Sequence, residues 1–263
     1  MKMLPLLLAG LTAAVSSMAQ IKTETVEYKH GDVTLQGYLS YDSTVKGKRP
    51  AVLVVHDWMG VSDDTKMRAE QLAGLGYVAL TADVYGKGIR PKNAQEASAE
   101  AGKYYKDRSF LRARVRAGLD FLSSREQADP TQLAVMGYCF GGACALELAR
   151  SGAPVKGVVT FHGGLANPNP ADAKNIKGKV LVLHGADDPF VKQKEVRSFM
   201  DEMRAAGVDW QLVQYSGAVH SFTVKAAGND NSKGAAYNAV ADRRSWQAMM
   251  DFFAETFGAQ PQQ

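Results

Sequence analysis

The sequence predicts an α/β fold built on a mostly parallel, doubly wound sheet with an antiparallel edge at its N-terminal end. Short apolar runs alternate with amphipathic segments along most of the chain, which is typical of strand–helix–strand units. Residues 51–55 are apolar without interruption, as expected of a central parallel strand that is covered on both faces. Consecutive parallel strands then require right-handed crossovers through the helices between them.

The first two strands are predicted to form the antiparallel edge of this sheet. Residues 25–28 and 33–41 alternate between apolar and polar side chains, as half-buried strands do. His30 and Gly31 lie in the short turn between them, so the two strands predict a hairpin and His30 is not expected to bind a ligand. A polar link at 46–50 then leads to the central strand.

A helix is predicted after the central strand, with Ser62 as its N-cap residue. Its apolar face is expected to bury Met67, Leu72 and Leu75. Gly76 is expected to end the helix, because glycine readily adopts the left-handed conformation found at helix C-termini. Residues 77–80 then predict the next strand.

Two further helices are predicted before the next strand. The polar, alanine-rich residues 93–105 predict a short helix over the carboxyl edge of the sheet, where ligands bind in such folds. Residues 109–122 predict an amphipathic helix with one apolar face and one solvated, arginine-rich face. The apolar face contains Leu111, Val115, Leu119 and Leu122, and the solvated face contains Arg112, Arg114 and Arg116.

The C-terminal half predicts three more strands, at 155–161, 181–183 and 211–215. A surface loop is expected at 166–174, a helix that ends at Gly207 follows the second of these strands, and a final helix spans about 236–257. The expected buried residues of these two helices are Val191, Val196, Phe199, Met200 and Met203 in the first, and Val240, Trp246, Met249, Met250 and Phe253 in the second.

Cys139 occupies the most informative position in the chain. It lies between the apolar run 133–136 and the helix-forming residues 143–150, in the pattern Gly137-Tyr138-Cys139-Phe140-Gly141. Gly-x-Cys-x-Gly is the pattern of a nucleophile elbow, a turn so tight that the central side chain stands clear of the sheet. The alternative for this stretch alone is a strand-to-helix turn with a small buried thiol.

Acids and a histidine downstream of Cys139 favour the elbow. Asp187 and Asp188 follow one later strand, and His220 follows another. Nucleophile, acid and then histidine is the chain order of a known class of catalytic triad. Cys139 is therefore predicted to be the nucleophile of an acyl transfer and His220 its base, with one of the two aspartates orienting the imidazole.

Four segments of the chain resemble those of the dienelactone hydrolase family. They are His56 to Gly60, Gly137 to Gly142, His184 to Phe190 and Gly217 to Phe222. The resemblance spans nearly the whole chain, residues 25–257, and implies an α/β-hydrolase fold that cleaves small carboxylic esters or lactones through a thioester. In the family motif the acid directly precedes a Pro-aromatic or Pro-aliphatic pair, so the resemblance selects Asp188 and leaves Asp187 as a turn former or a solvated charge.

The resemblance also assigns groups beside the nucleophile. The backbone amides of Trp58 and Phe140 match the two oxyanion donors of the family. Asp57 stands where relatives carry a glutamate that is thought to hold the thiol unreactive until substrate arrives. Because aspartate is one methylene shorter, whether its carboxylate reaches Cys139 is left open.

The substrate pocket is expected to be partly aromatic. Its expected residues are Tyr85, Lys87, His162 and Phe222. Dienelactone hydrolases bind the carboxylate of their substrate with arginines, whereas the corresponding positions here hold Lys87 and Val224. The resemblance therefore implies an ester or lactone substrate more strongly than dienelactone itself. A structural role is an equal alternative for His162 and for each aromatic residue.

Residues 1–19 have the pattern of a secretory signal peptide. A single charge, Lys2, precedes an uncharged apolar segment, and small residues follow up to Ala19. Cleavage after Ala19 would leave residues 20–263 as one hydrolase domain, periplasmic or secreted and not attached to a membrane. The alternative is an uncleaved N-terminal anchor.

The chain has two cysteines, Cys139 and Cys144. In a helix that begins at Phe140, residues five apart point to faces about 140° apart, so no disulfide is expected between them. An unpaired thiol in an exported protein suggests that the thiol is used.

Charge and motif spacing exclude several function classes. The formal charge of +4 becomes +3 without Lys2, and no basic cluster is interleaved with aromatic residues, so no nucleic-acid partner is expected. The spacing of His, Cys and Asp predicts no metal site, and no phosphate-loop motif or other cofactor signature occurs. The expected partner is a small ester or lactone, and the oligomeric state is not predicted. Ligand binding without turnover and a thiol-redox role stay open as alternative functions.

Overall fold

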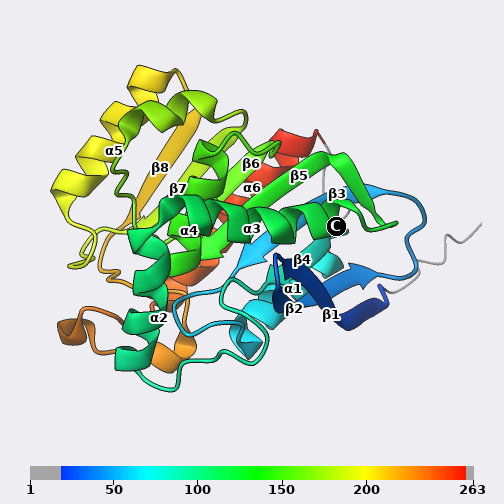
Figure 1. Cartoon of the computed structure of the whole chain (residues 1–263). Coiled ribbons are helices and arrows are strands. Elements are labelled where there is room, and N and C mark those ends of the chain that lie inside the picture. Colours follow the sequence, from blue (N-terminus) through cyan, green and yellow to red (C-terminus); the bar gives the residue numbers. More distant parts are fainter. Residues whose placement is uncertain (1–18, 259–263) are drawn as a thin grey trace, which may run out of the picture.

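The computed structural model describes residues 19–258 and contains an eight-stranded sheet (Figure 1). The strand order is β1-β2-β4-β3-β5-β6-β7-β8; β1–β2 and β2–β4 are antiparallel, and the other neighbouring pairs are parallel. The predicted α/β-hydrolase fold with an antiparallel N-terminal edge is thereby confirmed. The predicted signal peptide, except for Ala19, lies outside the described residues.

The strands and helices follow one another in the predicted order. The strands are β1 (Ile21–His30), β2 (Val33–Asp42), β3 (Arg49–Val55), β4 (Val78–Ala82), β5 (Ala128–Tyr138), β6 (Gly157–Phe161), β7 (Lys179–Gly185) and β8 (Trp210–Tyr215). The helices are α1 (Asp63–Gly74), α2 (Ala94–Lys106), α3 (Arg108–Ser123), α4 (Phe140–Arg150), α5 (Gln193–Ala206) and α6 (Ala239–Phe257). Short 3₁₀ turns occur at η1 (Pro170–Asn175), η2 (Lys225–Ala227) and η3 (Asn231–Lys233). Within residues 19–258, no helix is both long enough and apolar enough to cross a membrane.

Helices cover both faces of the sheet, which explains the continuous apolar run of β3. Ala51, Leu53 and Val55 belong to the core that α3, α4 and α5 cover. Val52 and Val54 point to the opposite face and pack in the core with α1 and α6. In Figure 1, α3 and α4 lie in front of the sheet and α6 lies behind it.

Two apolar residues that the sequence places in the core lie at the surface. Met67 of α1 is 37% exposed and Val240 of α6 is 44% exposed. The buried face of α1 instead runs through Arg68, whose guanidinium pairs with Asp242 of α6. Val240 is the second residue of its helix, preceded there only by Ala239 and the capping residue Asn238. Apolar character alone therefore gave the wrong burial for one residue at the edge of each helix face.

The arginine-rich face of α3 is solvated only in part: Arg116 is exposed as predicted, whereas Arg112 and Arg114 are not. Arg114 is buried, with its guanidinium 5.0 Å above the ring centre of Phe110. Arg112 donates a hydrogen bond of 2.8 Å to Glu147, a fully buried residue of α4. The partner of Arg112 comes from another helix, so the sequence of α3 by itself does not reveal the pairing.

Candidate active site

Cys139 forms the turn between β5 and α4, with a backbone φ of 52° and ψ of −113°. Residues other than glycine rarely adopt a positive φ, and such strain is typical of functional sites. The two flanking positions have room only for glycine. A Cβ on Gly137 would lie 2.1 Å from the carbonyl oxygen of Gly141, and a Cβ on Gly141 would lie 2.2 Å from the carbonyl oxygen of Val55. The turn therefore fixes the thiol at the carboxyl end of β5.

The structure brings Cys139, His220 and Asp188 into one line of contacts. His220 Nε2 lies 3.1 Å from Cys139 Sγ, and His220 Nδ1 lies 2.7 Å from Asp188 Oδ2. The other oxygen of Asp188 accepts hydrogen bonds from the amides of Phe190 and Val191, at 2.8 and 3.2 Å. The carboxylate is thus fixed by its own loop and fixes the imidazole in turn.

The pKa values of this pair move in opposite directions. Burial by itself would lower the pKa of His220, but its hydrogen bonds to Asp188 and Cys139, with the charges of both groups, raise it to about 10. Burial by itself would raise the pKa of Asp188, but the hydrogen bond and charge of His220 hold it below its ordinary value. Both shifts favour an ion pair between the protonated His220 ring and the Asp188 carboxylate.

His162 forms a wall beside the His220 ring. The two rings meet edge to face with their centres 5.2 Å apart, and His162 Nε2 lies 2.8 Å from the hydroxyl of Thr223. Burial and the charge of His220 hold the pKa of His162 well below its ordinary value, so this ring is neutral. Phe190 also packs edge to face on His220, with the ring centres 5.5 Å apart. These contacts restrict rotation of the imidazole.

Two backbone amides, one next to Cys139 and one after the neighbouring strand β3, are candidates to bind a ligand. Phe140 is the first residue of α4, where the helix dipole is positive and the N–H groups have no intrahelical acceptor. Trp58 follows β3, and its carbonyl accepts a hydrogen bond from the Tyr85 hydroxyl at 2.9 Å. Among the described residues, neither the Phe140 nor the Trp58 amide donates a hydrogen bond.

Asp57 makes no hydrogen bond to Cys139, although both residues belong to the described part of the chain. Its carboxylate accepts a hydrogen bond of 2.8 Å from the amide of Met59. It lines a separate small cavity of about 20 Å³, together with Tyr138 and Thr223. Burial raises the pKa of Asp57, and the charge of His220 opposes this shift.

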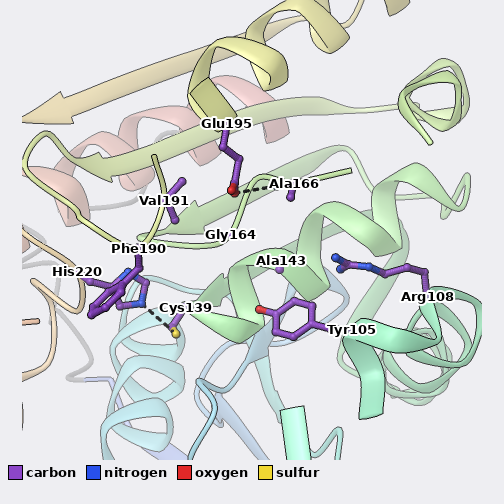
Figure 2. Close-up of a pocket in the computed structure, with 10 residues that line it drawn as sticks. All are labelled: Tyr105, Arg108, Cys139, Ala143, Gly164, Ala166, Phe190, Val191, Glu195 and His220. Atoms are coloured by element: carbon purple, nitrogen blue, oxygen red, sulfur yellow. Dashed lines mark hydrogen bonds between the residues drawn. The ribbon is translucent and has the colours of Figure 1, made fainter. Parts of the chain in front are cut away.

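A cavity of about 360 Å³ opens beside the thiol (Figure 2). Cys139, His220 and Phe190 lie at one end of it, and Tyr105 and Arg108 lie toward the other end. Tyr105 is the penultimate residue of α2 and Arg108 is the first of α3, so the helix that the sequence predicts over the carboxyl edge does reach this site.

The four residues that the sequence places in the pocket have different surroundings in the structure. Tyr85, Lys87, His162 and Phe222 are all absent from the lining of the cavity beside Cys139. Tyr85 and Phe222 are buried in the core, and Lys87 pairs with Glu27 at 2.6 Å on the surface. Their role in binding a substrate stays a prediction, because a position near a strand end indicates proximity to the edge but not the direction of the side chain.

Three polar residues of the cavity were not predicted from the sequence. Glu195 of α5 lines it, and its Oε1 accepts hydrogen bonds from the amides of Leu165 and Ala166, at 2.7 and 2.9 Å. Glu195, Tyr105 and Arg108 lie on three different helices and share no motif. The polar composition of 93–105 is the one signal that pointed to this wall.

The two cysteines of the chain are both free thiols. Cys139 is half-buried and Cys144 is buried, and both are unpaired. Burial raises the pKa of Cys144 well above its ordinary value, which keeps this thiol protonated and inert. Within residues 19–258 no group of three or more His, Cys, Asp or Glu side chains is arranged to hold a metal ion.

Comparison with protein families and curated proteins gives consistent matches. Residues 35–257 match the model of the dienelactone hydrolase family. A putative carboxymethylenebutenolidase of Aquifex aeolicus is 26% identical over 234 residues, which cover 88% of this chain and 97% of the relative. A protein of the same description from Yersinia pestis is 27% identical over 246 residues, covering 88% of this chain and 87% of the relative.

Solved structures share the fold. The crystal structure of the dienelactone hydrolase-like promiscuous phosphotriesterase P91 from metagenomic libraries has a TM-score of 0.87 and 43% sequence identity, over 90% of this chain and 99% of that chain. A putative dienelactone hydrolase from Klebsiella pneumoniae has a TM-score of 0.77 over 90% of this chain and 99% of that chain. Its identity of 23% makes it a likeness of fold alone.

Proposed function

The chain belongs to the dienelactone hydrolase family, and on this premise we propose that it hydrolyses small carboxylic esters or lactones through Cys139, His220 and Asp188. The observation that carries the proposal is the continuous line of contacts from the thiol through the imidazole to the carboxylate, at 3.1 and 2.7 Å. Groups of these types at these distances can act as the nucleophile, base and orienting acid of acyl transfer.

In the first half-reaction the thiolate of Cys139 attacks the carbonyl carbon of the substrate. The carbonyl oxygen becomes an oxyanion, which the amides of Phe140 and Trp58 can stabilise by hydrogen bonds. When the tetrahedral intermediate collapses, the bond to the alcohol oxygen breaks, and His220 gives its proton to that oxygen. The acyl group remains on Cys139 as a thioester and His220 is neutral.

Acylation changes the acid–base character of His220. The hydrogen bond and charge of Cys139 contribute to its high pKa, and both disappear in the thioester. A lower pKa favours the neutral imidazole, which can take a proton from a water molecule that attacks the thioester carbonyl. Collapse of the second tetrahedral intermediate breaks the C–S bond, releases the acid and restores the thiolate and the imidazolium.

Turnover of p-nitrophenyl acetate tests this mechanism. We expect the wild type to release p-nitrophenolate and to lose activity with iodoacetamide, and Cys139→Ala and His220→Ala to lose about 10³-fold or more in kcat. Cys139→Ser tests whether the site needs sulfur, since a hydroxyl is far harder to ionise than a thiol. Circular dichroism checks that each variant is folded. Full activity in Cys139→Ala would remove the mechanism.

Mass spectrometry separates catalysis from the two alternative uses of the thiol. A binding protein without turnover would accumulate acylated Cys139 and release no acid. A redox protein would show reversible oxidation of Cys139 by peroxide. The buried, protonated Cys144 is a poor resolving thiol for such a cycle. Intact-mass measurements after exposure to ester or to peroxide give a different product for each case.

A second candidate substrate is a phosphotriester. It is favoured by the 43% identity with the structure described as a promiscuous phosphotriesterase. In this reaction the thiolate would attack phosphorus and displace an aryloxide, and water would then cleave the P–S bond. Release of p-nitrophenolate from paraoxon, together with its loss in Cys139→Ala, tests this activity. Stable phosphorylation of Cys139 without further release would instead make the phosphotriester an inhibitor.

We also propose that the protein is exported, on the basis of the signal-peptide pattern in residues 1–19. Expression of the full chain in a bacterium, followed by cell fractionation and N-terminal sequencing, tests this proposal. The expected product is periplasmic or secreted and begins at Gln20. A product that retains Met1 and stays with the membrane fraction would favour an uncleaved anchor.

A further inference from the structure

We propose that Tyr105 and Arg108 form a hydrogen-bond donor wall that selects esters or lactones whose acyl chain carries a second, uncharged oxygen acceptor, such as an ether or ketone. The proposal rests on the proposed function, since it concerns the cavity beside Cys139. His220 gives its proton to the alcohol oxygen, so the alcohol leaves at the His220 end. The acyl chain then extends away from His220, toward Tyr105 and Arg108 (Figure 2).

Tyr105 presents an unused hydroxyl to the cavity. Its ring packs edge to face on Phe140, with centres 5.5 Å apart and planes at 89°. A Cβ placed on Gly164 would lie 3.9 Å from the Tyr105 oxygen, so the hydroxyl reaches across to the facing wall. Among residues 19–258 it has no hydrogen-bond partner. Burial, with a contribution from the Cys139 charge, raises the pKa of Tyr105, so the group stays an O–H donor.

Arg108 extends the donor wall behind this hydroxyl. Its guanidinium lies 4.9 Å above the ring centre of Tyr105, and Arg108 lines the same cavity, although its Nη1 is itself buried on the side of Glu147. Glu147 Oε1 is 3.9 Å from Nη1, which is too long for a hydrogen bond. Glu147 already accepts from Arg112 and Arg150, at 2.8 and 3.1 Å. Guanidinium N–H groups can only donate hydrogen bonds. A ligand group that contacts Arg108 in the cavity is therefore expected to be an acceptor.

The surrounding charges favour an uncharged acceptor. Glu195 faces the same cavity, and Glu147 lies buried behind Arg108. Glu195 thus offsets the positive charge of the guanidinium, whereas Glu147 is already paired with Arg112 and Arg150. A carboxylate on the substrate would meet the field of Glu195, whereas an ether or ketone oxygen gains the hydrogen bonds without that repulsion.

A series of three p-nitrophenyl esters tests the proposal: 3-methoxypropionate, its isostere pentanoate, and the anionic hemisuccinate. Uncatalysed hydrolysis is subtracted from each rate. We expect kcat/KM for the methoxy ester to exceed that for pentanoate by about threefold to tenfold, the typical net effect of a neutral hydrogen bond. In Tyr105→Phe this ratio should fall to about one. Tyr104→Phe is the matched control, because the Tyr104 hydroxyl donates to the carbonyl of Val84, and it should keep the wild-type ratio.

The outcomes separate this inference from the proposed function. Equal rates for methoxy ester and pentanoate in the wild type, or a ratio that survives in Tyr105→Phe, would overturn the donor wall while ester hydrolysis through Cys139 stands. If hemisuccinate were the best substrate and Arg108→Gln abolished that advantage, the subsite would be anionic and the uncharged acceptor would be wrong. Retained turnover in Cys139→Ala would overturn the proposed function itself.

Discussion

Two neighbouring aspartates follow β7, and only Asp188 touches His220. Its Oδ2 lies 2.7 Å from His220 Nδ1, whereas Asp187 Oδ2 accepts from the exposed amide of Gly217 at 3.0 Å. We expect Asp188→Asn to lower kcat/KM by about 10²- to 10⁴-fold, because an amide no longer fixes the tautomer or stabilises the imidazolium. The matched control Asp187→Asn should stay within about twofold, since an amide oxygen can still accept from Gly217. Similar losses in both variants would show that the pair acts through loop structure.

The charge of His220 gives a pH dependence with a definite sign. Contacts with Asp188 and Cys139 raise its pKa from the ordinary 6.5 to about 10, so the imidazolium persists until the pH rises through about 10. The stability that it contributes is fully present below pH 6.5 and is lost toward pH 10. We expect NMR titration of labelled histidine to show His220 changing near pH 10 in the wild type. Cys139→Ala should lower this pKa, and a value near 6.5 in both proteins would contradict the ion pair.

At the scale of residues, sequence order indicated Cys139, His220 and the neighbouring pair Asp187 and Asp188, because each follows a strand and the carboxyl ends of parallel strands meet at one edge. The resemblance to the family then selected Asp188. The same reasoning did not indicate the residues that line the cavity. Tyr105 and Arg108 reach the cavity from the junction of two helices, and no spacing rule connects that junction with the elbow. Which way a loop or helix side chain turns is decided by packing across the chain, which the local pattern does not contain.

The elbow between β5 and α4 allows a test at the scale of elements. A Cβ on Gly137 would lie 2.1 Å from the carbonyl oxygen of Gly141, and this backbone cannot yield without opening the turn. We expect Gly137→Ala to lower the free energy of unfolding by about 3 kcal/mol or more. Gly102→Ala in α2 is the control, because its added methyl meets nothing within 4 Å. It should stabilise the protein by about 0.5–1 kcal/mol, as measured by urea unfolding. Equal stability of the two variants would contradict the steric account.

The elements themselves could largely be read from periodicity, since apolar runs and glycine or capping residues marked strands and helix ends. Which residues at the edges of a helix face are buried could not be predicted in this way. Met67 looks like a core residue and lies at the surface, while Arg68 beside it is buried and paired with Asp242. A buried arginine needs an anionic partner. Here that partner lies in a distant segment, so the sequence pattern of one helix does not identify it.

At the scale of the whole molecule, a buried ion cluster connects the helices on the α4 side of the sheet. Arg150 of α4 binds Glu202 of α5 through two hydrogen bonds, 2.9 and 2.8 Å long, and Glu147 at 3.1 Å. Its Nη2 also donates to the carbonyl of Leu165, at 3.2 Å. The amide of Leu165 is held by Glu195, which lines the cavity. The cluster therefore fixes one wall of the cavity as well as the packing of α4 on α5.

Removing one member of this cluster should cost far more than removing an exposed pair. In Arg150→Met, Glu202 loses its cationic partner and Glu147 keeps only Arg112 within hydrogen-bond distance, so we expect the free energy of unfolding to fall by about 3–5 kcal/mol. The control is Arg116→Met on α3, whose ion pair with Asp120 is 45% and 58% exposed, and it should change stability by less than about 1 kcal/mol. Urea denaturation measures both, as a shift of the midpoint at constant slope. Because Arg150 also holds Leu165, its variant should raise KM for esters, whereas the exposed variant should leave KM as it is. A small decrease in the free energy of unfolding of Arg150→Met would mean that the cost of burying these charges nearly equals the stabilisation from their ion pairs.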